Sequence, residues 1–166
     1  MSQTEKLVAN AAAYFERGTH DGSQEARPAL GVAVVSCMDA RIDLFALLGL
    51  EIGDAHVIRN AGGLVTDDAI RSLAISQRYL GTKEIVLIHH TNCGMEGLDD
   101  EKLAGDLEKE TGSRPRWKAG GFTDAAEDVR RSIDILRSSP FIPSRDSIRG
   151  FVFDVKTGRL EEVVPG

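Results

Sequence analysis

GVAVVSCMDAR, residues 31–41, is the stretch that decides the fold. Its first half is apolar and β-branched without alternating polar positions, which is typical of a strand buried on both faces of a parallel sheet. Two more runs of this kind follow, AHVIR at 55–59 and EIVLIHH at 84–90. The segment between the second run and the third has the periodicity of a helix. The alternation of strands and helices predicts an α/β fold with a mainly parallel central sheet flanked by helices.

The N-terminal segment predicts an amphipathic helical arm over about residues 3–17. Ser2 and Glu5 have the spacing of a capping box, and Gly18 stands where a glycine would end the last turn. The apolar stripe of this helix can pack on the chain's own sheet or on a partner subunit. Periodicity alone does not decide between these two packings.

Three further helices and a C-terminal hairpin complete the pattern. Thr66 caps a helix that ends at Gly81, and charged periodic segments at 99–111 and 123–138 predict two more. IRGFVFDV and RLEEVV follow, joined by the turn KTG. This is the pattern of a hairpin, so we expect the last strand to be antiparallel at an edge of the sheet.

Length and composition favour a single domain over residues 1–166. A chain of 166 residues with 42% hydrophobic content buries roughly two thirds of the surface that its unfolded form exposes. The net charge of −6 and the lack of a Lys/Arg cluster argue against a nucleic-acid partner. No signal-peptide pattern or long apolar stretch indicates a membrane partner, so we expect a cytoplasmic protein. In such a reducing compartment, two cysteines disfavour a structural disulfide.

Two of the buried strands are followed by residues that bind metals. Cys37 ends the first strand, and His90 and Cys93 lie at the end of the third. Ligands of open parallel sheets lie beyond the carboxyl ends of the strands, so neighbouring first and third strands would bring these side chains together. Two thiolates and one imidazole suit Zn²⁺, and three protein ligands leave the fourth position open, as in catalytic sites. A buried Cys or His is often only structural, but the two motifs together favour the metal site.

Asp39 and Arg41 follow Cys37 at alternate positions. If the chain stays extended, all three side chains project to the same side, and Arg41 can hold the carboxylate of Asp39 in a two-pronged ion pair. The alternative is an ordinary surface ion pair of little energetic value. His89 faces away from His90 in a continuing strand, so we expect core packing for His89 rather than metal binding.

The motif Cys37-x-Asp39-x-Arg41, followed by His90-x-x-Cys93-Gly94, resembles the zinc signature of the β-class carbonic anhydrases, especially their short bacterial members. VIRNAGG at 57–63 and the segment 69–95 add to the likeness, which covers about residues 30–98. The resemblance implies zinc binding by Cys37, His90 and Cys93 and a catalytic dyad of Asp39 and Arg41. It also implies a sheet order of 2-1-3-4, and a homodimer or larger homo-oligomer with the active site at the subunit contact.

One position departs from the family pattern. Plant-type members have a glutamine that helps to hold substrate where this chain has Glu51. An ionised carboxylate cannot donate the hydrogen bond of that amide, and it would repel bicarbonate. The resemblance therefore implies metal binding but does not extend to substrate positioning at this residue.

The expected reaction is the reversible hydration of CO₂ to bicarbonate and a proton. Asp39 is expected to accept a proton from the zinc-bound water and to orient the zinc hydroxide that attacks CO₂. The nearest alternative is hydrolysis of carbon disulfide or carbonyl sulfide at the same site. A second is a non-catalytic protein with a structural zinc ion. Arg59 and Asn60, beyond the end of the second strand, support the site or simply form a turn. A zinc dehydrogenase is disfavoured because no GxGxxG follows a strand.

Overall fold

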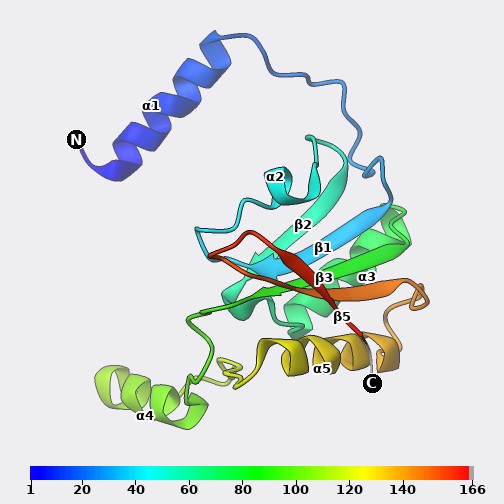
Figure 1. Cartoon of the computed structure of the whole chain (residues 1–166). Coiled ribbons are helices and arrows are strands. Elements are labelled where there is room, and N and C mark those ends of the chain that lie inside the picture. Colours follow the sequence, from blue (N-terminus) through cyan, green and yellow to red (C-terminus); the bar gives the residue numbers. More distant parts are fainter. Residues whose placement is uncertain (165–166) are drawn as a thin grey trace.

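Five strands form one sheet in the order β2-β1-β3-β4-β5 (Figure 1). The computed structural model describes residues 1–164. Neighbouring strands are parallel except β4 and β5, which are antiparallel, so the expected strand order and edge hairpin are confirmed. The strands are β1 (Val32–Cys37), β2 (Ala55–Asn60), β3 (Glu84–His90), β4 (Ile148–Phe153) and β5 (Leu160–Val163).

The expected helices are present, and the structure adds a short one. The predicted cap of α3 is confirmed, since the Thr66 side chain accepts a hydrogen bond from the Ala69 N–H, and Gly81 follows the helix with a positive φ of 76°. The added helix, α2, has five residues and follows the first motif, Cys37-x-Asp39-x-Arg41. The helices are α1 (Gln3–Glu16), α2 (Leu44–Leu48), the 3₁₀ turn η1 (Ala61–Gly63), α3 (Asp67–Tyr79), α4 (Asp100–Thr111) and α5 (Ala125–Ser138).

The main core lies between the sheet and the helices α3 and α5. Leu73 of α3 and Ile133 of α5 are fully buried against Val35 and Leu87 of the central strands. Burial of each such aliphatic side chain contributes about 1.5–3 kcal/mol of transfer free energy. The other face of the sheet is covered less completely, because Val86 on that face is only partly buried. The first motif begins at the carboxyl end of β1, and the second motif, His90-x-x-Cys93, begins at the carboxyl end of β3.

Helix α1 lies apart from the sheet, connected to β1 by an exposed segment (Figure 1). The predicted capping box of Ser2 and Glu5 is present. None of the residues in α1 is buried, so the helix does not pack on its own sheet. No helix within residues 1–164 has the length and apolarity that crossing a membrane requires.

Candidate metal centre

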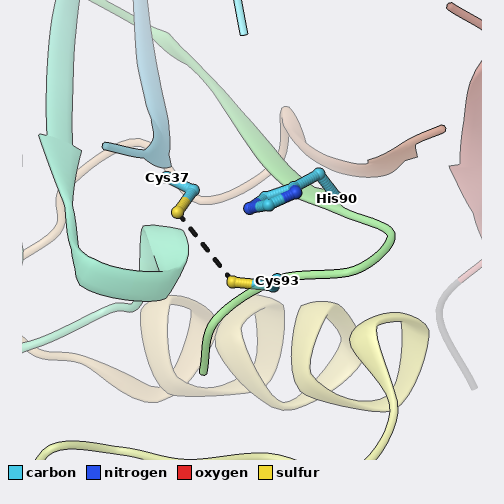
Figure 2. Close-up of side chains that lie close together, drawn as sticks. All are labelled: Cys37, His90 and Cys93. Atoms are coloured by element: carbon cyan, nitrogen blue, oxygen red, sulfur yellow. Dashed lines mark hydrogen bonds between the residues drawn. The ribbon is translucent and has the colours of Figure 1, made fainter. Parts of the chain in front are cut away.

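Cys37, His90 and Cys93 each bring one ligand atom to the same point (Figure 2). The two sulfurs and the imidazole nitrogen lie within 4.8 Å of one another, and the two Sγ atoms are 3.9 Å apart. All three residues are buried. Within the described residues this is the one group of three or more His, Cys, Asp or Glu side chains with metal-ligand spacing. The convergence expected from the sequence is therefore present.

Strand pairing and a tight turn at Asn92 produce this convergence. Because β1 and β3 are parallel neighbours with Ser36 opposite Ile88, Cys37 leaves the sheet beside the end of β3. After His90 the chain reverses at Asn92, whose φ of 54° lies in the left-handed region that asparagine tolerates better than most residues. This reversal brings Cys93 back toward Cys37, as Figure 2 shows.

The hydrogen bonding of His90 leaves one ring nitrogen free to bind a cation. Its Nδ1 atom lies 3.0 Å from the carbonyl oxygen of Thr91, which can only accept, so Nδ1 carries the hydrogen and Nε2 has the lone pair. Burial lowers the pKa of His90, which favours this neutral form. Of the buried side-chain nitrogen and oxygen atoms in residues 1–164, only His89 Nδ1 and His90 Nε2 have no hydrogen-bond partner. A divalent cation would satisfy Nε2 of His90.

A bound cation would change the protonation of the Cys93 thiol. Burial raises the pKa of the Cys93 thiol to about 11, because there is little water to stabilise a thiolate. A bound metal ion would reverse that preference, since a coordinating thiol loses its proton. Two sulfurs and one nitrogen are the donor set of three-ligand zinc sites that keep a fourth position open. The residues present thus fit a zinc ion.

Asp39 and Arg41 form an ion pair beside this cluster. Arg41 donates from Nε to one carboxylate oxygen of Asp39 at 2.8 Å and from Nη2 to the other at 2.7 Å. The guanidinium holds the pKa of Asp39 well below its usual range, so the carboxylate stays ionised. Its Oδ2 atom lies 3.8 Å from Nε2 of His90. An ionised hydrogen-bond acceptor therefore lies next to the three candidate ligands.

The end of β2 holds the backbone of the first motif in place. Arg59 donates from Nε to the carbonyl of Cys37 at 2.9 Å and from Nη2 to the carbonyl of Asp39 at 2.7 Å. The N–H of Met38 donates to the carbonyl of Asn60 at 2.8 Å. Of the two interpretations of Arg59 and Asn60, these contacts favour support of the site over a simple turn.

Two other residues singled out in the sequence lie away from the ligand atoms. His89 is fully buried on the opposite side of β3, where its Nε2 atom lies 2.7 Å from Asp128 of α5, so its expected core position is confirmed. Asp128 was not a candidate from the sequence, since an acidic residue in the first turn of a helix usually serves the helix dipole. Glu51 is exposed in the turn before β2, where its N–H donates to Asp54.

Comparisons with known proteins agree with this geometry. The family model described as "Carbonic anhydrase" matches residues 32–117. "Beta-carbonic anhydrase 1" of Mycobacterium tuberculosis is 54% identical over 138 residues, which cover 83% of this chain and 85% of that protein. "Carbon disulfide hydrolase" of Acidithiobacillus thiooxidans is 38% identical over 148 residues, covering 76% of this chain and 74% of that protein. The crystal structure of a carbonic anhydrase from Streptococcus mutans superposes with a TM-score of 0.89 at 41% identity and 99% coverage of both chains.

Proposed function

The chain belongs to the β-carbonic anhydrase family, and from that membership we propose that it catalyses the reversible hydration of CO₂ to bicarbonate and a proton, with zinc as its metal. The observation that carries the proposal is the buried cluster of Cys37, His90 and Cys93 with the Asp39–Arg41 ion pair beside it. We propose the first three residues as the zinc ligands and the ion pair as the catalytic dyad. A zinc ion at this position would supply Lewis acidity, which makes hydroxide available as a nucleophile near neutral pH.

We assign Asp39 the task of orienting the nucleophile. A carboxylate whose pKa is held well below its usual range is a weak base, so it is poorly suited to carry a proton away. It remains a strong hydrogen-bond acceptor, and it lies within 3.8 Å of a proposed ligand atom. Arg41 contributes by fixing the direction in which the carboxylate points. The dyad would thus act by positioning, which is the main resource for a substrate as small as CO₂.

The surroundings of the sulfurs suit an apolar substrate. Cys37 and Cys93 belong to a cluster of buried apolar side chains that includes Ile42, Leu64 and Phe122. Apolar side chains of this kind would offer CO₂ no hydrogen bonds and would exclude bulk water from it. Binding can therefore contribute little to the rate, and most of the acceleration must come from how the nucleophile is generated and held.

Stopped-flow CO₂ hydration with a pH indicator tests the proposal. Metal-loaded wild-type protein is compared with metal-stripped protein and with the Cys37→Ser variant, and zinc content is measured on each sample. We expect one zinc ion per chain and rapid hydration in the loaded wild type, and loss of both in the variant. Stoichiometric zinc with neither CO₂ turnover nor sulfide release from carbon disulfide would instead indicate a structural metal. Protein with no zinc at all would refute the proposal.

Similarity to a carbon disulfide hydrolase supports a second candidate activity at the same site. Carbon disulfide and carbonyl sulfide are linear triatomic molecules like CO₂, so the same nucleophile can attack them. Their hydrolysis releases sulfide, which a methylene-blue assay measures. Sulfide release together with slow CO₂ hydration would favour this activity, and rapid CO₂ hydration without sulfide release would favour carbonic anhydrase.

We further propose that the chain forms a homodimer or larger homo-oligomer in which α1 packs on a partner subunit. Leu7, Val8 and Phe15 of α1 are 68%, 65% and 83% exposed, and the helix makes no buried contact with its own subunit. Burying these side chains on a second copy would remove them from water. Light scattering after size exclusion tests this, with Leu7→Asp expected to shift the protein toward monomer and Asn10→Asp, on the same helix, expected not to. A wild-type monomer would refute the proposal.

A further inference from the structure

A buried, hydrogen-bonded pair of side chains lies behind the candidate metal centre, on the other side of β3. His89 is fully buried, and its Nε2 atom lies 2.7 Å from an oxygen of Asp128, which is itself almost completely buried in α5. The other oxygen of Asp128 accepts a hydrogen bond from Arg131, one turn further along the helix. Well-packed apolar residues of similar volume are often at least as stabilising as a buried polar pair of this kind. The pair therefore calls for a role beyond filling the core.

The ring of His89 contacts the segment that follows Cys93. His89 packs against Phe122 with their ring centroids 5.5 Å apart. Two backbone hydrogen bonds hold Phe122 to that segment. The Phe122 N–H donates to the carbonyl of Met95 at 3.2 Å, and the Phe122 carbonyl accepts from the N–H of Gly97 at 2.7 Å. The Met95 N–H in turn donates to Sγ of Cys93 at 3.5 Å. A continuous series of contacts thus connects Asp128 with the sulfur of Cys93.

His89 also precedes His90 in the chain. Its ring orientation therefore bears on two of the candidate ligands, on His90 through the backbone of β3 and on Cys93 through Phe122. Within residues 1–164 the bond to Asp128 is the one hydrogen bond that the ring makes, because its Nδ1 atom has no partner. Without the carboxylate, no hydrogen bond would set the orientation of the ring against Phe122.

We propose that Asp128 is a positioning residue for the metal centre, which acts through His89 and Phe122 to hold His90 and Cys93 at the distances that zinc requires. This inference rests on the proposed zinc site. Groups that orient metal ligands from outside the coordination sphere typically change metal affinity by about 10- to 100-fold when they are removed. The effect should appear in binding as well as in catalysis.

The test measures zinc affinity by competition with a chromophoric chelator and ligand geometry from the visible spectrum of the cobalt(II)-substituted protein. We expect Asp128→Ala to weaken zinc binding about 10-fold or more and to alter the cobalt spectrum. Asp128→Asn should restore most of the affinity, because an amide oxygen still accepts a hydrogen bond from His89. Val129→Ala, which shortens a fully buried side chain on the same helix, controls for a loss of stability. It should lower the unfolding midpoint and leave zinc affinity unchanged.

Phe122→Leu provides a second variant if Asp128→Ala does not fold. It leaves the His89–Asp128 pair intact and removes the ring contact, so it too should weaken zinc binding. Wild-type affinity in Asp128→Ala or in Phe122→Leu would overturn the inference, as would equal weakening in Val129→Ala. These outcomes are distinct from failure of the proposed function, which would appear as a lack of zinc binding in the wild-type protein itself.

Discussion

Arg41 connects the two halves of the candidate site, because the Nη2 atom that donates to Asp39 also donates to the carbonyl of Asn92 at 2.9 Å. Asp39 and Arg41 lie in the segment after β1, and Asn92 lies between the two candidate ligands that follow β3. A single guanidinium therefore sets the direction of the carboxylate and its distance from the second motif. Arginine suits this task because its planar group presents several donors in fixed directions.

Replacement of Arg41 by lysine should reduce activity without removing the metal. Lysine keeps the positive charge but cannot donate to both oxygens of Asp39 and to Asn92 in the same geometry. We expect kcat/KM for CO₂ hydration to fall by about 100-fold, as small errors in the position of a catalytic group can cost this much. Zinc content should stay at the wild-type level. Arg71→Lys, in the exposed Arg71–Asp68 pair of α3, is the matched control and should be silent. Equal activity in Arg41→Lys and wild type would contradict the assigned role.

Gly63→Ala should damage both the fold and the metal centre. Gly63 has a φ of 72°, and a Cβ atom placed on it would lie 2.8 Å from the backbone nitrogen of Cys37. Gly158 has a similar φ of 75° with open space around it, so Gly158→Ala measures the backbone strain alone. That strain should cost about 1–2 kcal/mol in free energy of unfolding. Gly63→Ala should cost more and should also weaken zinc binding, as measured by denaturant titration and chelator competition. Equal losses in the two variants would show that close packing against Cys37 is unimportant.

Much of the fold could be predicted from local patterns, and the helix that was missed is too short to show one. The run EIVLIHH has the same bounds as β3, and Thr66 marks the start of α3. Helix α2 was missed because five residues are too few to show a helical period. Its signals were Asp43, whose side chain caps the helix, and Gly49, which ends it in the left-handed conformation.

The residues of the candidate site could also be predicted only in part. Cys37, His90 and Cys93 could be picked out because their side chains bind metals wherever they occur, and their position at strand ends indicated that they meet. That β1 and β3 are neighbours came from the resemblance to a family, since strand order depends on contacts between distant residues. The pairing of His89 with Asp128 had no local signal, because the two residues are 39 positions apart and meet only when α5 packs on β3.

The Asp128 carboxylate should make the fold sensitive to acid. Burial alone would raise its pKa, but the hydrogen bond from His89 and the nearby charges outweigh burial, so the pKa lies below the ordinary value of 3.8. A carboxyl group with a lowered pKa stabilises the fold at pH values above its unfolded pKa, and this contribution is lost as the pH falls through the folded pKa. Wild-type protein should therefore lose unfolding free energy below about pH 4 more steeply than Asp128→Asn. Denaturant titrations at several pH values measure this, and parallel curves for the two proteins would contradict the prediction.

Metal binding should become tighter as the pH rises. The buried Cys93 thiol has a pKa of about 11 in the metal-free protein, so it is protonated near neutral pH and must lose its proton to bind zinc. Each unit of pH makes that loss easier by a factor of ten, so the apparent zinc affinity should rise by about tenfold or more per unit between pH 6 and 8. Chelator competition across this range measures the slope, and calorimetry in buffers of different ionisation enthalpy counts the protons released. Cys93→Ser should weaken zinc binding and flatten the slope, since the proton of this thiol is no longer displaced. An affinity independent of pH would mean that zinc binds without displacing the proton of Cys93, and Cys93 would then have to be removed from the proposed ligands.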